Sequence, residues 1–152
     1  MSSIVIRKAR EYDMEPLAGL CRESLKVTFG DRAHRWSGEN EIDKYIRGNW
    51  PAMLVAQLDD RLAGFASLRD GKIDVTWIGM EFRNQGIGRE LMDAVEQQVS
   101  EGYPRISVEC YVPDKQTIQF YKGRGYSVER EYTDGISGID KVVMSRILEG
   151  KD

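Results

Sequence analysis

The sequence has little of the chemistry that builds a metal site or a disulfide framework. Its 152 residues include two cysteines, Cys21 and Cys110, and one histidine, His34. The cysteines form no CxxC pair, so a zinc site is not expected and we assign no metal ligands. The first residues (MSSIVIRKAREYD) lack the apolar core of a signal peptide. Together with the few cysteines, this favours a protein of the reducing cytoplasm, and we expect that location.

Long apolar runs and a strong charge of one sign are also absent. A transmembrane helix needs about 20 apolar residues, and the runs in this sequence are much shorter. The formal net charge is -3 with acids and bases interspersed, so we expect no membrane and no nucleic acid as partner. With 41% hydrophobic and 31% charged residues, the composition is typical of a globular chain, and we expect a single domain over residues 1–152.

Apolar periodicity and turn residues predict about seven strands and several helices. The predicted strands are 4–8, 53–58, 62–68, 73–80, 105–112, 126–132 and 142–148. The predicted helices are 14–29, 39–48, 89–100 and 114–123. A strand, loop, helix, strand crossover stands in the centre, and the other connections favour antiparallel pairs. The class is therefore α/β (α+β), with a mixed, mostly antiparallel central sheet and helices on both faces.

The loop at residues 83–89 (RNQGIGR) joins a predicted strand to a predicted helix. Its two glycines let the backbone turn sharply and approach a ligand closely. The first N–H groups of a helix, with its dipole, favour an anion, and the two arginines add positive charge. The GxGxxG pattern fails because Leu91 stands at the third glycine. The loop predicts a pyrophosphate site, and a plain tight turn is the alternative.

The GNAT superfamily of N-acetyltransferases has a [Q/R]-x-x-G-x-[G/A] signature, which residues 83–88 (RNQGIG) resemble. The preceding residues 78–82 are similar to the strand end of the family, with Met80 in place of the usual proline. Residues 114–121 resemble its N-x-x-A-x-x-F-Y helix, with Asp114 for Asn and Thr117 for Ala, and a G-[F/Y] pair follows. The resemblance covers nearly the whole chain and implies the GNAT-like acyl-CoA N-acyltransferase fold, with its two central parallel strands splayed apart.

The resemblance also implies acetyl-CoA as co-substrate. In the family the pantetheine lies in the wedge between the splayed strands, here 73–80 and 105–112, and pairs with one of them like an added strand. The helix-start amides hold the pyrophosphate. The residues expected to bind the cofactor are Ile78, Gly79, Met80, Arg83, Asn84, Gln85, Gly86, Ile87, Gly88, Arg89 and Asp114.

Two residues are the predicted catalytic groups. Acetyl transfer needs a neutral amine, donors for the oxyanion and a proton for the departing thiolate. Tyr121 matches the family tyrosine that protonates the sulfur, and a packed core aromatic is the alternative. Glu109 stands 12 positions earlier and resembles the base of family members that acetylate protein N-terminal amines. An exposed solubilising carboxylate is its alternative, and Asp74 or ordered water are rivals for the base.

The acceptor amine stays open at this stage. The family builds that site from the loop between the first two helices and from the last hairpin, here about 29–39 and 133–140. The first loop is basic and the second is acidic, so charge does not select the acceptor. A polyamine, an aminoglycoside, an amino acid and a peptide amine all remain candidates. The family likeness also suggests a homodimer. The leading function is N-acetyl transfer to a primary amine by direct attack in a ternary complex. The alternatives are a non-catalytic acyl-CoA-binding or sensing domain, and a toxin-type acetyltransferase of aminoacyl-tRNA, which the missing basic stripe disfavours.

Overall fold

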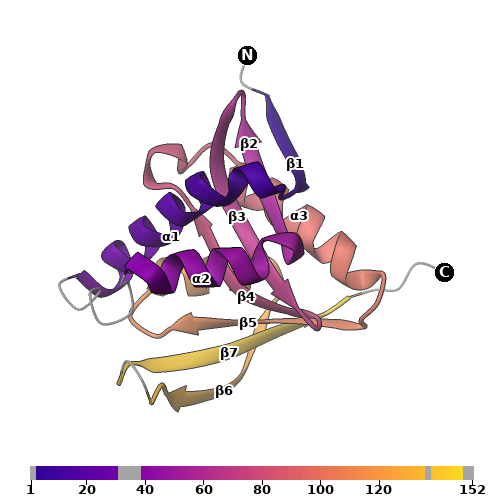
Figure 1. Ribbon diagram of the computed structural model, residues 1–152. Helices are drawn as coiled ribbons and strands as arrows, with labels where there is room; N and C mark the ends of the chain where they lie inside the picture. Colours follow the sequence, from indigo (N-terminus) through magenta and orange to yellow (C-terminus); the bar gives the residue numbers. More distant parts are fainter. Residues whose placement is uncertain (1–2, 31–38, 136–137, 149–152) are drawn as a thin grey trace. The chain divides into compact units, whose positions relative to one another are not determined.

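The computed structural model describes residues 3–30, 39–135 and 138–148, so His34 and most of the first predicted acceptor loop lie outside it. The strands form a seven-stranded sheet in the order β1-β2-β3-β4-β5-β7-β6 (Figure 1). The β4–β5 pair is parallel, and the β1–β2, β2–β3, β5–β7 and β6–β7 pairs are antiparallel. In the described part of the chain, no helix has the length and apolar character needed to cross a membrane.

The elements follow the predicted order, and their ends differ from the predicted ones by no more than two residues. The strands are β1 (Ile4–Lys8), β2 (Met53–Leu58), β3 (Arg61–Arg69), β4 (Lys72–Ile78), β5 (Arg105–Tyr111), β6 (Ser127–Thr133) and β7 (Asp140–Ile147). The helices are α1 (Met14–Phe29), α2 (Glu39–Asn49), α3 (Ile87–Ser100) and α4 (Lys115–Gly123). The mixed sheet with helices confirms the predicted fold class.

The chain divides into two compact units. The first comprises Met1–Leu68 and Val75–Val95, and the second Arg69–Asp74 and Glu96–Asp152. The predicted cofactor loop belongs to the first unit. Both predicted catalytic residues belong to the second. The single-domain organisation predicted above stays a prediction.

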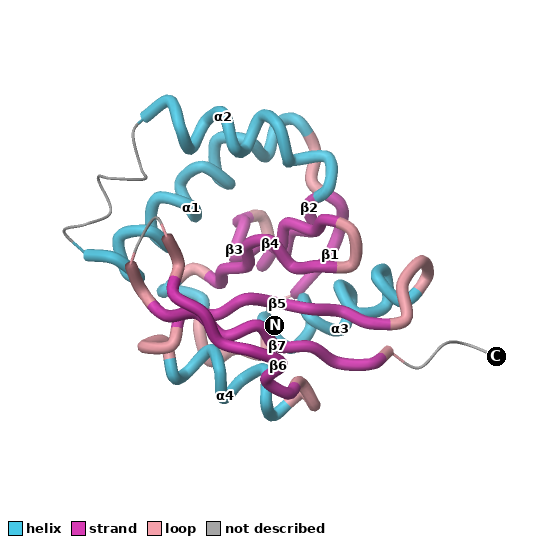
Figure 2. The backbone as a smooth tube through the Cα atoms, turned by 90° about the horizontal axis from the view of Figure 1, so that it is seen from below, coloured by secondary structure: helices cyan, strands magenta, loops and turns pink. Residues whose placement is uncertain are grey.

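In the first unit, apolar side chains cover both faces of the strands. Val55 of β2 and Phe65 of β3 are fully buried in one cluster with residues of α1 and α2, which run side by side (Figure 2): Leu17, Ala18, Cys21, Ile42 and Ile46. Ala56, the next residue of β2, belongs to a second cluster with Phe82 and Ile87. Because successive strand side chains point to opposite faces, the two clusters lie on the two sides of the strands.

β4 ends at Ile78, two residues before its predicted end, because the chain turns at Gly79. The backbone N–H of Gly79 donates to the carbonyl of Ala63 at 2.8 Å, and residues Met80–Phe82 then form a 3-10 turn. An added Cβ at Gly79 would lie 3.1 Å from Phe82 and 3.3 Å from Leu20 of α1. Close packing of α1 and of the turn therefore fixes where this strand ends.

In the second unit, β7 lies between β5 and β6 (Figure 1). The β5 side chains alternate as predicted: Ile106, Val108 and Cys110 are buried, and the residues between them are half-buried. The parallel ladder joins Lys72 to Ser107 and Ile73 to Val108, so it covers only the first two residues of β4.

Candidate functional site

The loop before α3 has the backbone geometry of a ligand-binding turn. Asn84 and Gly86 have left-handed φ angles of 63° and 79°. At Gly86 an added Cβ would meet nothing within 4 Å, so backbone conformation, and not crowding by the protein, favours glycine there. α3 begins at Ile87, two residues before the predicted start, and the N–H of Glu90 bonds to the carbonyl of Gly86 at 3.2 Å. Gly88 and Arg89 therefore lie in the first helical turn.

The first turn of α3 presents backbone donors while one side chain anchors it. The first N–H groups of a helix have no intrahelical acceptor, so those around Ile87 to Arg89 are suited to an anion. The Ile87 side chain is 1% exposed and packs in the second apolar cluster. Asn84, Gln85, Gly86 and Arg89 are exposed. The turn is thus held from inside and open to a ligand outside.

Arg83 folds back onto the end of β4. Its Nε donates to the carbonyl of Ile78 at 3.1 Å, and its Cζ lies 4.4 Å from the centre of the Trp77 ring. The guanidinium plane thus combines a hydrogen bond with a cation–π contact. The arginine connects the loop to the strand end, and its predicted role at the pyrophosphate stays a prediction.

Glu23 of α1 holds the same strand end, and sequence reasoning missed it. Its Oε1 accepts from the backbone N–H of Met80 and from Nε1 of Trp77, each at 2.8 Å. A proline at position 80, as in the resembled family, would have no N–H to donate. Met80, where the family has proline, therefore supplies a backbone N–H, and the Glu23 carboxylate of α1 accepts its hydrogen bond.

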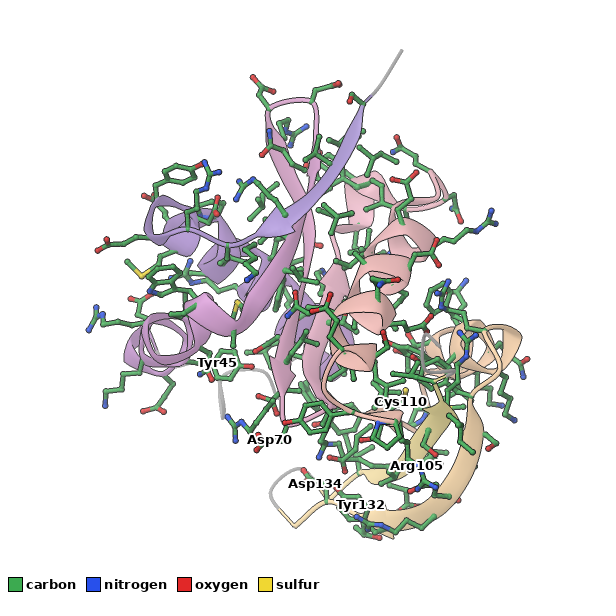
Figure 3. All side chains as sticks on the ribbon, turned by 90° about the vertical axis from the view of Figure 1, so that its right-hand side faces the viewer. Tyr45, Asp70, Arg105, Cys110, Tyr132 and Asp134 are labelled. Carbon is green, nitrogen blue, oxygen red and sulfur yellow. The ribbon has the colours of Figure 1, made fainter. Side chains whose placement is uncertain are left out.

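Glu109 is the centre of a hydrogen-bonded group in the second unit. Its Oε2 lies 2.5 Å from Nζ of Lys72, and its Oε1 accepts from the hydroxyl of Tyr132 on β6, which Figure 3 labels beside Asp134. Burial alone raises the pKa of the Glu109 carboxyl, but the bonds from Lys72 and Tyr132 outweigh it and leave the pKa below its usual value. The bond to Glu109, with burial, raises the pKa of Tyr132 to about 12. At neutral pH the pair is a carboxylate and a phenol.

Asp74, the rival base, has different surroundings. Its Oδ2 lies 3.7 Å from Nη2 of Arg69, and its side chain is 30% exposed against 16% for Glu109. An ion pair of this length and exposure is weak. Asp74 is therefore the more solvated of the two carboxylates.

Tyr121 is 1% exposed, and aromatic rings surround it. Its ring meets those of Phe120 and Tyr126 edge-on, with centroids 5.3 and 5.1 Å away. Burial, with smaller contributions from Cys110 and two carboxylates, raises the pKa of Tyr121 well above that of an ordinary phenol. The hydroxyl of Tyr126 in turn donates to Oε2 of Glu96 at 2.7 Å. Tyr121 therefore keeps its proton at neutral pH.

Asp114 caps α4, and both its carboxylate oxygens bond inside the cap. Oδ1 accepts from the backbone N–H of Thr117 at 3.3 Å, and Oδ2 accepts from its hydroxyl at 2.7 Å. Such a cap satisfies an orphan helix donor. Its predicted contact with the cofactor stays a prediction.

Proteins similar to this chain in sequence and in fold are named acetyltransferases. The Acetyltransferase (GNAT) family matches residues 18–126. The peptidyl-lysine N-acetyltransferase YiaC of Escherichia coli K12 is 26% identical over 132 residues, which are 82% of this chain and 84% of YiaC. The peptidyl-lysine N-acetyltransferase YjaB of Salmonella typhimurium LT2 is 28% identical over 127 residues, with the same coverage. The structure of YncA from Salmonella typhimurium with its cofactor acetyl-CoA has a TM-score of 0.78 at 14% identity, over 99% of this chain and 96% of that one.

Proposed function

Because the chain belongs to the GNAT acetyltransferase family, we propose that it transfers the acetyl group of acetyl-CoA to a primary amine by direct attack in a ternary complex. The observation that carries this proposal is the left-handed turn at Asn84 and Gly86, which leads into the first turn of α3 within the family match. The turn offers open space beside Gly86 and a row of helix-start amides, so the residues present fit a pyrophosphate.

The cofactor, when bound, supplies a thioester whose acyl group is already activated. The amides of residues 84–89 would hold its pyrophosphate, with Arg89 adding charge. The carbonyl of Ile78 has a second lone pair, so it can accept from a pantetheine amide while Arg83 stays in place. The single N–H of Met80 is already given to Glu23, which makes Ile78 the better pairing partner.

Two residues would carry the proton transfers. Tyr121 would give its hydroxyl proton to the departing sulfur, so that an O–H bond breaks and an S–H bond forms. Its hydroxyl keeps its proton at neutral pH, as a general acid must, and burial, which raises its pKa, makes it a weak acid that gives up the proton only to a developing thiolate. Glu109 would receive the proton of the acceptor ammonium, directly or through water. Its low pKa makes it a weak base, and its charge also favours attraction of a cation. Asp74 and ordered water are the alternatives for this step.

The two cysteines support direct attack over an acetyl-cysteine intermediate. Burial raises the pKa of both Cys21 and Cys110 to about 12. The thiolate is the nucleophilic form of cysteine, and it is scarce at neutral pH for such thiols.

Among primary amines, we propose a lysine side chain of a peptide as acceptor. YiaC and YjaB are both named peptidyl-lysine N-acetyltransferases, and each matches 82% of this chain. The cytoplasmic location and the homodimer predicted from the sequence stay predictions.

The test is an assay of free thiol released from acetyl-CoA with a panel of acceptors. The panel contains a lysine peptide capped at both ends, a lysine-free peptide with a free N-terminus, spermidine, an aminoglycoside and free lysine. We expect amine-dependent release, fastest with the capped lysine peptide, and an acetylated lysine in its mass spectrum. Tight binding of coenzyme A without release by any amine would instead identify a sensing domain.

A further inference from the structure

Glu23 is a half-buried carboxylate, and its two hydrogen-bond donors among the described residues are both neutral. An indole N–H and a backbone N–H bond to its Oε1, and neither neutralises its charge. Three carboxylates of similar or greater burial have cationic partners: Asp13 pairs with Arg7, Glu96 with Arg124 and Arg146, and Glu109 with Lys72. Asp114 also has neutral donors, but each of its two carboxylate oxygens accepts a hydrogen bond inside the α4 cap. Within residues 3–30, 39–135 and 138–148, no ion pair involves Glu23 and its Oε2 accepts no hydrogen bond.

The packing of α1 holds this carboxylate in a fixed place. Leu20 lies one helical turn before Glu23 on the same face, and it is the α1 side chain that crowds Gly79. Leu20 is buried, so the helix cannot rotate away without exposing it. The two N–H donors then orient one edge of the carboxylate, which leaves Oε2 as the accepting atom. Such preorganisation lowers the entropy lost when a ligand binds.

The position also lies at the exposed end of β4, within the first unit. Met80 is 49% exposed, and Glu23 bonds to its backbone. The carbonyl of Ile78, which the proposed function assigns to the pantetheine, lies two residues earlier. A cation bound at Oε2 therefore lies beside the strand end that the cofactor is proposed to pair with.

From these contacts we infer that Glu23 is the anchor for the ammonium group of the acceptor. A charged, preoriented carboxylate oxygen binds a primary alkylammonium through a short charge-assisted hydrogen bond. The inference rests on the proposed function for the identity of the reaction, and it concerns recognition of the amine. Removal of the ammonium proton before attack stays assigned to Glu109, with Asp74 and ordered water as the alternatives.

The first test measures binding without catalysis. The probe is n-butylammonium chloride, with n-butanol as the neutral isostere, and the readout is the NMR signal of the Trp77 indole N–H, which bonds to Glu23. We expect a saturable shift with butylammonium and none with butanol. In Glu23→Gln, which keeps an oxygen acceptor but loses the charge, the affinity should fall at least fivefold. Glu23→Asp should recover part of it.

The second test measures transfer to the capped lysine peptide. Glu23→Gln should raise the KM for the peptide at least tenfold and leave the KM for acetyl-CoA within twofold. The matched control is Glu15→Gln, the same charge change on an exposed residue of α1, which should alter neither constant. Equal butylammonium affinity in wild type and Glu23→Gln, or an unchanged peptide KM, refutes the anchor.

The two tests also separate this inference from the proposed function. If Glu23→Gln loses butylammonium binding and the wild-type protein transfers acetyl to no amine, the anchor is supported and the proposed transferase activity is overturned. Normal transfer with an unchanged KM in Glu23→Gln would do the reverse.

Discussion

Lys72 and Glu109 form an ion pair between β4 and β5, with Nζ 2.5 Å from Oε2. The lysine belongs to the first position of the parallel ladder, and the glutamate lies one residue beyond the last. The pair therefore sits where pairing of the two strands stops. The hydroxyl of Tyr132 takes the other oxygen, so both oxygens of the carboxylate have a partner.

Lys72→Met should shift the pH dependence of the reaction if Glu109 is the base. The bond from Lys72 helps to hold the pKa of Glu109 low, so its removal raises that pKa. The acid limb of the kcat/KM profile should then move to higher pH by about one unit. Lys44→Met, on an exposed position of α2, is the control and should leave the limb in place. If the pH profiles of kcat/KM are the same for both variants, Glu109 is not the base.

Tyr121→Phe should lower kcat by about 10²-fold or more, because a positioned general acid contributes that much. The KM for acetyl-CoA should stay within threefold. The control is Tyr126→Phe, which removes a hydroxyl that bonds to Glu96 and should reduce stability by about 1–3 kcal/mol, with a smaller effect on kcat. Steady-state kinetics and urea unfolding measure both. An unchanged kcat in Tyr121→Phe would make Tyr121 a packing residue.

Gly86→Val should weaken coenzyme A binding at least tenfold. A β-branched residue at a φ of 79° is strained by about 1–2 kcal/mol, and the loop relieves the strain by moving its amides. Gly30→Val introduces a similar strain at a φ of 57° after α1 and should leave coenzyme A affinity unchanged. Calorimetric titration of coenzyme A compares the two. Retained binding in Gly86→Val would remove the loop from the cofactor site.

Asp13→Asn should lower the free energy of unfolding by about 2 kcal/mol at pH 7, since Arg7 loses one of two acceptor oxygens and the negative charge that strengthens both bonds. Burial raises the pKa of Asp13, but the bonds from Arg7 and from the Arg10 amide outweigh it and lower the net value. The contribution is therefore complete above the unfolded pKa of about 3.9 and disappears as pH falls through the lower folded value.

Urea unfolding between pH 7 and pH 3 checks this prediction. Wild type and Asp13→Asn should converge toward the acid end. Asp43→Asn, whose exposed pair with Arg22 spans 3.6 Å, should lower stability by no more than about 0.5 kcal/mol at any pH. A constant difference between wild type and Asp13→Asn at all pH values would contradict the assignment.

The fold and the cofactor loop could be predicted because both depend on local pattern. Alternation along β5 and the glycines at 86 and 88 are visible within a few residues. Glu23 could not be predicted, because its partners stand 54 and 57 positions away and only tertiary packing brings them together. The sequence predicts the end of β4 two residues too late for the same reason. The packing of Leu20 and Phe82 against Gly79 determines where the strand ends.

The cap of α4 has a consequence for redesign. Asp114 and Thr117 each depart from the resembled family pattern, yet they are bonded to each other through two contacts. A protein engineer who restores only the family alanine at 117 would leave one carboxylate oxygen without its hydroxyl donor. Restoring only asparagine at 114 would keep an oxygen for the Thr117 N–H, and its Nδ2 could donate to the threonine hydroxyl oxygen. The order of the two exchanges therefore matters: asparagine at 114 first, and alanine at 117 second.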